Sequence, residues 1–296
     1  MRLERCELCP RRCGVDRTKG ERGFCGAGDV IRIARAAPHF WEEPPISGTR
    51  GSGTVFFSHC TLGCVYCQNG PISHGGAGWE VTPERFREIC DELIGKGVHN
   101  INLVTPTHYL PLILLALSGL PVPVVMNSGG YERAETLREL EGKIRIYLPD
   151  FKYALPELAE EYSAAADYPE TALGAIREMI RQTGKPVFDG EGLLQSGVIV
   201  RHLILPNGVK NSVRALEILA DAFPKGSFLL SLMSQYTPAG GAREIRRLSR
   251  RVTPSEYGRV LRRMEELGFE EGFTQELSSA AEEYVPPFDG TGVKRT

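Results

Sequence analysis

From residue 54 onward, short runs rich in β-branched and aromatic residues alternate with segments of helical periodicity. This alternation is typical of βα units, in which helices connect parallel strands. Six strands are expected, over residues 54–59, 100–106, 121–130, 143–153, 197–206 and 227–238, with a weaker seventh over 272–277. Helices are expected over residues 82–97, 132–140, 154–165, 168–184, 212–223 and 253–268. An α/β fold with a partial (β/α)6 barrel of the TIM type is therefore predicted, and a doubly wound sheet remains the alternative because one sequence does not give strand order.

Length and charge narrow the class of protein further. The chain has 296 residues, a size at which an α/β barrel folds around one core. Its 35 basic and 37 acidic residues carry no polybasic signal for a nucleic acid or a membrane surface. The apolar stretch 109–126 is interrupted by three prolines, so a buried helix followed by a strand is expected there. The N-terminus lacks the apolar run of a secretory signal, and a cytoplasmic location is expected.

Three cysteines lie close together directly after the first expected strand. Cys60, Cys64 and Cys67 occur within "CTLGCVYC". Three thiolates at this spacing can hold three irons of a cubane cluster and leave the fourth iron without a protein ligand. Zinc competes because His59 and His74 flank the loop, although structural zinc takes four protein ligands. An electron-transfer cluster is the other alternative, and it normally has four cysteine ligands.

A second cysteine cluster stands near the N-terminus. Cys6, Cys9, Cys13 and Cys25 form a C-x2-C-x3-C-x11-C pattern with proline and glycine turns. Four sulfurs without histidine suit structural zinc or a second iron–sulfur cluster, and spacing does not decide between them. The chain therefore divides into a Cys-rich metal-binding extension (1–50), the partial barrel (51–285) and an irregular tail (286–296).

The C-x3-C-x2-C motif at the end of a first strand, with an aromatic residue before its third cysteine, resembles the radical S-adenosylmethionine (SAM) superfamily. The resemblance implies that the three cysteines bind a [4Fe–4S] cluster, that SAM chelates its open iron, and that Tyr66 lies near the adenine. One electron, from a low-potential donor such as flavodoxin or ferredoxin, then cleaves SAM to methionine and a 5′-deoxyadenosyl radical. That radical abstracts hydrogen from a substrate, while the protein positions the reactants.

Several further motifs resemble the pyruvate formate-lyase-activating-enzyme-related proteins of the PflX type. They are "CQNGPISH", "NINLVTPTHYLP", "YLPDFKY", "VIVRHLILPNG", "SLMSQYTP" and "VPPFD", and they cover most of residues 1–290. The resemblance implies an oxidoreductase. Its substrate is either a glycine of a partner protein, as for glycyl-radical activases, or a small metabolite or other macromolecule. An iron–sulfur carrier or metal-binding protein that does not cleave SAM is the alternative from another class.

By comparison with activating enzymes, two strand ends are expected to surround the methionine carboxylate of SAM. "NSGGY" supplies Asn127 and Ser128, and "LPDFK" supplies Asp150 and Lys152. Oxygen ligands suit a hard cation, and a monovalent cation here stays open because Asn127 replaces an aspartate of the family. A structural ion pair between Asp150 and Lys152 is the alternative interpretation.

The second strand end departs from the superfamily. It reads "LVTPTHYLP" where the superfamily has a Gly-Gly-Glu element, so Thr105 and Thr107 offer hydroxyl groups in place of a carboxylate. Arg201 and His202 alternate on a later strand, so one of them points inward. Further candidates at strand ends, each with a structural alternative, are His108, Gln235 and Tyr236.

Overall fold

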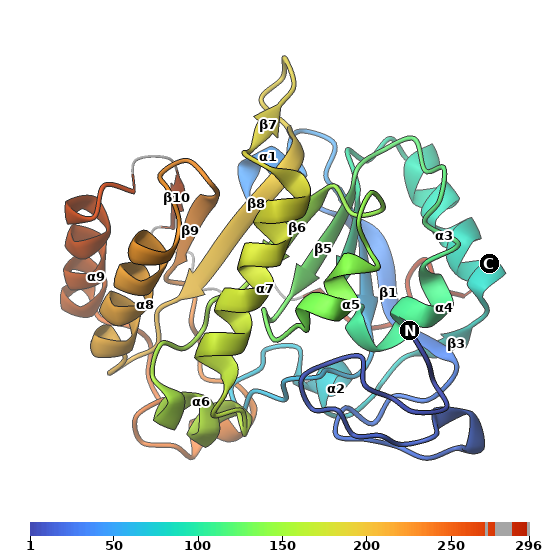
Figure 1. The fold of residues 1–296 in the computed structure, drawn as a ribbon, viewed down its shortest axis with the longest axis horizontal. Helices are drawn as coiled ribbons and strands as arrows, with labels where there is room; N and C mark the ends of the chain where they lie inside the picture. The colour runs from blue at the N-terminus through green and yellow to red at the C-terminus, as the bar shows by residue number, and fades with distance from the viewer. Residues whose placement is uncertain (270–271, 276–285, 295–296) are drawn as a thin grey trace.

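A mostly parallel sheet organises the chain (Figure 1), which the computed structural model describes over residues 1–269, 272–275 and 286–294. Its strands follow the order β10-β9-β8-β6-β5-β4-β2-β1-β3, and from β2 to β10 every neighbouring pair is parallel. The parallel strands are β2 (Ser52–Phe57), β4 (Ile101–Val104), β5 (Val124–Ser128), β6 (Ile146–Pro149), β8 (Leu194–Leu203), β9 (Leu229–Met233) and β10 (Gly272–Thr274). Because they follow chain order without reversal, the sheet winds in one direction as in a barrel, unlike a doubly wound sheet. The predicted α/β class is confirmed, and the weak seventh strand is the short β10; residues 276–277 of that expectation lie outside the described part.

Helices cover the face of the sheet turned to the viewer in Figure 1. Thr82 caps the first long helix by accepting a hydrogen bond from the backbone N–H of Arg85, and Thr253 forms a capping box with Glu256 on the last one. The helices that follow β3 are α3 (Pro83–Gly95), α4 (Leu110–Ile113), α5 (Ala134–Arg138), α6 (Pro156–Ser163), α7 (Tyr168–Thr183), α8 (Val209–Ala222) and α9 (Pro254–Glu266).

The helix expected at the start of the apolar stretch 109–126 is much shorter than the sequence suggests. After a 3-10 turn, Thr107–Tyr109, α4 covers only four residues, and turns occupy most of the chain up to β5. The side chain of Leu115 is 87% exposed. The apolar composition therefore does not correspond to a continuous buried helix here.

Two edge strands extend the sheet beyond the predicted barrel. β1 (Ile31–His39) pairs antiparallel with β2, and β3 (Trp79–Val81) pairs antiparallel with the start of β1. The short β7 (Val187–Phe188) forms a hairpin with β8. The sequence prediction did not include these strands.

A short helix, α1 (Pro44–Ser47), closes the amino end of the concave face of the sheet. Ile46 is fully buried among inner-face side chains of four parallel strands. Its partners are Val125, Ile146, Leu148, Leu194, Ile199 and Leu229. In Figure 1, α1 lies at the opposite end of the strands from α2 (Gly70–Ser73) and the N-terminal segment. The carboxyl ends of the strands are therefore the end at which loops can build a site.

The described part of the tail, 286–294, is irregular and lies along β1. The N–H of Ala36 donates to the carbonyl of Thr291 (2.9 Å), and the N–H of Gly290 donates to that of Ala34 (3.0 Å). Gly292 has φ +72°, and a Cβ there would lie 1.9 Å from the Ala36 carbonyl oxygen. The close approach of the two backbones thus requires glycine at this position. Among the described residues, no helix has both the length and the apolar character needed to cross a lipid bilayer.

Candidate active site

The cysteine triplet lies on the loop between β2 and α2. Each sulfur accepts a hydrogen bond from a different part of the chain. The Leu62 N–H donates to Cys60 Sγ (3.4 Å), the Ser163 hydroxyl to Cys64 Sγ (3.1 Å) and the Ser73 hydroxyl to Cys67 Sγ (3.3 Å). Such bonds orient the sulfurs and stabilise negative charge on them. Gly63, at φ +70°, supplies the left-handed turn between the first two cysteines.

The three thiols lie within electrostatic reach of one another. Burial raises the pKa of Cys60 to about 12, and the neighbouring Cys64 and Cys67 raise it further. No three His, Cys, Asp or Glu side chains in the described part of the chain converge tightly enough to hold one metal ion. A cubane places each cysteine on a different iron, so its ligands do not have to converge on one point. A [4Fe–4S] cluster on these three cysteines stays a prediction.

The Tyr66 side chain belongs to a buried group of tyrosines. Its ring contacts those of Tyr153, Tyr162 and Tyr236 edge-on. The Tyr153 hydroxyl donates to that of Tyr66 (2.8 Å) and also bonds Ser163, the residue that donates to Cys64. These contacts hold the cysteine loop in place. The expected position of Tyr66 beside an adenine stays a prediction.

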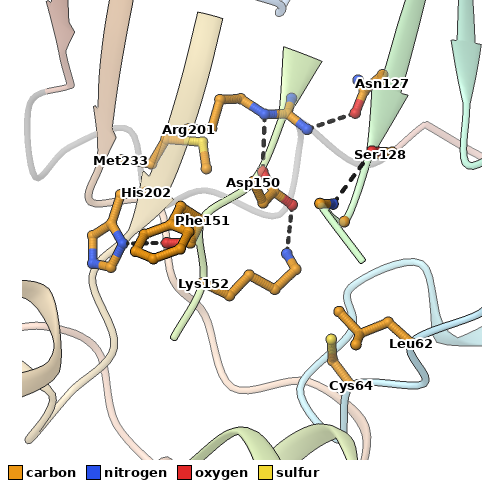
Figure 2. Close-up of polar contacts among 12 residues, drawn as sticks. Leu62, Cys64, Asn127, Ser128, Asp150, Phe151, Lys152, Arg201, His202 and Met233 are labelled. Atoms are coloured by element: carbon orange, nitrogen blue, oxygen red, sulfur yellow. Dashed lines mark hydrogen bonds and ion pairs between the residues drawn. The ribbon is translucent and has the colours of Figure 1, made fainter. Parts of the chain in front are cut away.

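An ion-pair network joins three neighbouring strand ends (Figure 2). The Lys152 ammonium donates to Asp150 Oδ2 (2.5 Å), and Arg201 Nε donates to Asp150 Oδ1 (3.0 Å). Arg201 Nη2 also donates to Asn127 Oδ1 (2.5 Å). Burial acts to raise the pKa of Asp150, but Lys152 and Arg201 outweigh it, so the net pKa is lowered and the carboxylate stays ionised. The structure thus brings together four of the residues that the sequence proposed.

Lys152 also connects this network to the cysteine loop. Burial acts to lower the pKa of Lys152, whereas Asp150 and then Cys64 raise it, and the net shift is upward. In Figure 2 the Lys152 side chain extends to Asp150 near the loop that carries Cys64. A positive charge therefore lies between the ion-pair network and the cysteines.

Glu42 completes the network, and the sequence analysis missed it. Its Oε2 pairs with Arg201 Nη1 (3.3 Å), while Oε1 accepts from Asn102 Nδ2 (3.0 Å) and Asn127 Nδ2 (3.2 Å). Burial raises the pKa of Glu42, and Arg201 opposes that effect. The sequence signal was the pair of glutamates in "WEEPP", although nothing local indicates that they enter the concave face of the sheet.

Thr107, from the segment after β4, and Ser128, at the end of β5, both bond the buried carboxyl group of Glu132. Thr107 Oγ1 donates to Glu132 Oε2 (2.8 Å), and Ser128 also bonds Glu132 and caps the turn at Gly130. Thr105, at φ +58°, bonds the Asn127 carbonyl through its backbone N–H (2.7 Å). The Ser128 side chain therefore bonds Glu132 and the turn at Gly130, and Glu132 is a second residue that the sequence analysis missed.

The other strand-end candidates make structural contacts, with one exception. His202 bonds the Phe151 carbonyl (2.6 Å) and Ser212 of α8 (2.8 Å), so it points outward while Arg201 points inward. His108 Nε2 bonds the Ser58 carbonyl (2.8 Å). Tyr236 donates to the Leu248 carbonyl (2.7 Å) and is buried, whereas Gln235 lines the cavity inside the sheet.

The N-terminal segment, residues 1–30, forms a knuckle of tight turns around a small internal cavity. Its four cysteines, Cys6, Cys9, Cys13 and Cys25, all line that cavity. Burial raises the pKa of Cys9 to about 12, and the nearby Cys25 and Cys13 add to the shift. Arg17 is fully buried there, with Nη1 on the His108 carbonyl (2.6 Å) and 4.0 Å from Cys6 Sγ. Four thiols beside a buried cation suit an anionic metal–thiolate group.

Arg11 fastens this knuckle to the cysteine loop. Its guanidinium donates to the carbonyls of Thr61 (3.2 Å), Leu62 (3.2 Å) and Ser163 (2.8 Å) and packs 3.7 Å from the ring of Phe24. The two cysteine clusters, far apart in the sequence, are therefore neighbours in space.

Fold and site together define an α/β protein. The parallel strands of its sheet follow chain order, and a cysteine-rich site lies at their carboxyl ends. The family model of the radical SAM superfamily matches residues 54–277, most of the chain. The chain belongs to the radical SAM superfamily, whose members cleave SAM at an iron–sulfur cluster.

Individual relatives leave the substrate open. Over 271 residues the chain is 30% identical to the uncharacterized protein MJ0674 of Methanocaldococcus jannaschii, covering 88% of this chain and 74% of that protein. Among solved structures, methylornithine synthase (PylB) has a TM-score of 0.49 at 16% identity, covering 73% of this chain and 68% of that one. SuiB of Streptococcus suis has a TM-score of 0.47 at 15% identity, covering 75% and 49%.

Proposed function

We propose that this radical SAM enzyme holds a [4Fe–4S] cluster on Cys60, Cys64 and Cys67 and binds SAM between the cluster and the strand-end network. The observation that supports this most directly is the position of Lys152, which pairs with Asp150 and lies within electrostatic reach of Cys64 and Cys67. An iron–sulfur carrier would have no use for an ammonium held beside its cysteines by a buried carboxylate. When bound, the cluster supplies one electron to SAM.

The surrounding residues bind and orient SAM in this proposal. Lys152 and Asn127 meet the methionine carboxylate, since an ammonium and an amide N–H₂ both donate to it. Asp150 holds Lys152 in place, and Arg201 in turn holds Asp150. The donors to the three sulfurs stabilise the thiolates that iron requires. A monovalent cation held by the oxygen atoms of Asn127 and Asp150 stays part of the proposal.

The resemblance to PflX-type proteins suggests two kinds of substrate, and each defines one branch of the proposal. The first branch is hydrogen abstraction from a glycine of a partner protein, for which a chain segment would have to enter the concave face of the sheet. The alternative is a small metabolite or another macromolecule. A low-potential protein such as flavodoxin or ferredoxin would supply the electron, and the knuckle would hold zinc or a second cluster on its four cysteines.

The decisive experiment measures SAM cleavage. Protein reconstituted anaerobically with iron and sulfide is reduced with dithionite in the presence of SAM, and 5′-deoxyadenosine is quantified by mass spectrometry. We expect 5′-deoxyadenosine from the native sequence and none from Cys60→Ala, because the cluster loses a ligand. Cys90→Ala removes a thiol that is buried in α3 and should keep the activity. No 5′-deoxyadenosine from the native protein would refute the proposed function.

A further inference from the structure

A cavity of about 620 Å³ occupies the concave face of the sheet. It extends from Gln68 and Asn69, directly after the third cysteine, past Asn127 and Arg201 to Glu43 beside α1. Its size is within the range of small-molecule sites. Because it begins at the cysteine loop, a radical formed on SAM there would face a substrate inside it.

Glu43 is the least satisfied charged group in this cavity. Only 9% of the residue is exposed, and its Oε2 has no hydrogen-bond partner. Burial raises the pKa of the Glu43 carboxyl, and Arg201 and the hydroxyl of Ser231 only partly offset this. A buried carboxylate oxygen without a partner is costly, so a group kept in this state suggests a partner supplied by a ligand.

The charges around the cavity favour a positive partner. Among the described residues of the network and its cavity, three carboxyl groups (Glu42, Glu43 and Asp150) face two cations (Arg201 and Lys152). Arg201 already bonds Glu42, Asp150 and Asn127, and Lys152 is paired with Asp150. Once the carboxylate of SAM has taken Lys152 and Asn127, a second anionic group would compete for donors that are in use, whereas a cation on the substrate would pair with the unpartnered oxygen of Glu43.

Aromatic side chains line the same cavity. Trp41, Phe56 and Phe273 come from the segment after β1, from β2 and from β10. Aromatic faces attract cationic nitrogen, and a carboxylate beside them adds a charge-assisted hydrogen bond. Gln275, whose Oε1 also has no partner, supplies another acceptor.

We propose that the enzyme recognises its substrate through a positively charged nitrogen, an ammonium or guanidinium group, that pairs with Glu43 among these aromatic rings. The inference rests on the proposed function, because it takes the cavity as the place of hydrogen abstraction. Glu43 would be a binding residue that fixes which part of the substrate faces SAM.

Three probes with the same number of carbon atoms test the charge preference. Binding of n-pentylammonium, n-pentanol and n-pentanoate to the reconstituted protein with SAM is measured by calorimetry at constant ionic strength. We expect n-pentylammonium to bind at least about tenfold more tightly than the other two, as a charge-assisted hydrogen bond provides. Glu43→Gln should remove this preference, whereas Glu191→Gln, the same change on the exposed β7–β8 hairpin, should keep it.

Thermal unfolding separates recognition from a structural role. A neutral amide is less costly to bury than a carboxylate, so Glu43→Gln should unfold at the same or a higher temperature than the native protein. Equal binding of all three probes, tighter binding of n-pentanoate, or an unchanged preference in Glu43→Gln would overturn the inference while 5′-deoxyadenosine still forms. Ammonium binding without any SAM cleavage would instead overturn the proposed function, and with it the role of that nitrogen in a substrate.

Discussion

At the scale of single residues, the sequence predicted the groups whose spacing or position at a strand end carries the information. The cysteine triplet was evident from its spacing. Asp150 and Lys152 were proposed from their place at a strand end and the resemblance to activating enzymes, and Arg201 from its place within a strand. Glu42 and Glu43 could not be found in this way. They lie in a loop before the first parallel strand, and their partners come from strands much further along the chain.

Glu132, which the sequence analysis missed, has a strongly shifted pKa. Burial raises the pKa of its carboxyl to about 8, and hydrogen bonds from Thr107 and Ser128 oppose this only in part. The folded protein therefore keeps a proton that the unfolded chain has already lost, and its stability falls as pH rises toward the folded-state pKa. The loss is complete once the pH exceeds about 8.

This predicts a pH-dependent stability that one substitution removes. Between about pH 6 and pH 9, the free energy of unfolding of the native protein should fall by on the order of 2 kcal/mol relative to Glu132→Gln. The variant keeps an oxygen that accepts from Thr107 but does not titrate. Urea denaturation at both pH values, at equal metal content, measures the difference. Parallel pH profiles for the two proteins would contradict the prediction.

At the scale of elements, the strands were predicted where apolar runs end in polar residues, and the helix starts where Thr82 and Thr253 form caps. Other elements were harder to predict. In β1 the buried Ile31 and Ile33 alternate with arginine. This pattern is typical of a strand, although the sequence analysis did not predict one there. The sequence analysis overestimated the length of the helix expected after residue 109. Apolar composition alone does not distinguish turns that contain Pro and Gly from a continuous helix.

The four-residue helix α1 should matter more to stability than its length suggests. Ile46 in the four-residue α1 is fully buried among inner-face side chains, so Ile46→Ala leaves a cavity. We expect a loss of about 2–5 kcal/mol in the free energy of unfolding. Leu115→Ala, at a side chain that is 87% exposed, should change it by less than about 0.5 kcal/mol. Equal effects in chemical denaturation would show that α1 does not hold the core.

At the scale of the whole molecule, two metal sites are predicted from separate parts of the sequence and the fold makes them neighbours. The sequence could not reveal this because Arg11, which links the knuckle to the cysteine loop, bonds only backbone carbonyls. Such bonds leave no pattern in the residues that accept them. The spacing of the four knuckle cysteines also does not distinguish zinc from an iron–sulfur cluster.

Metal analysis of two variants tests whether the sites are independent. Cys60→Ala should lose about four irons per chain, the content of one cubane. Cys6→Ala should keep those irons and lose either one zinc ion or a second set of iron and sulfide. Iron, zinc and acid-labile sulfide are counted on both variants, with Cys90→Ala as the control. An unchanged metal content in Cys6→Ala would reject a metal site in the knuckle.

The cavity inside the sheet has walls from both ends of the strand order. His39 of β1 and Phe273 of β10 both line it, although six strands lie between β1 and β10 in the order of the sheet. The width of the cavity is therefore set by how strongly the sheet curls across its whole breadth. Substitutions in the strands that change this curvature would alter the largest substrate that the enzyme admits, even where they touch no ligand.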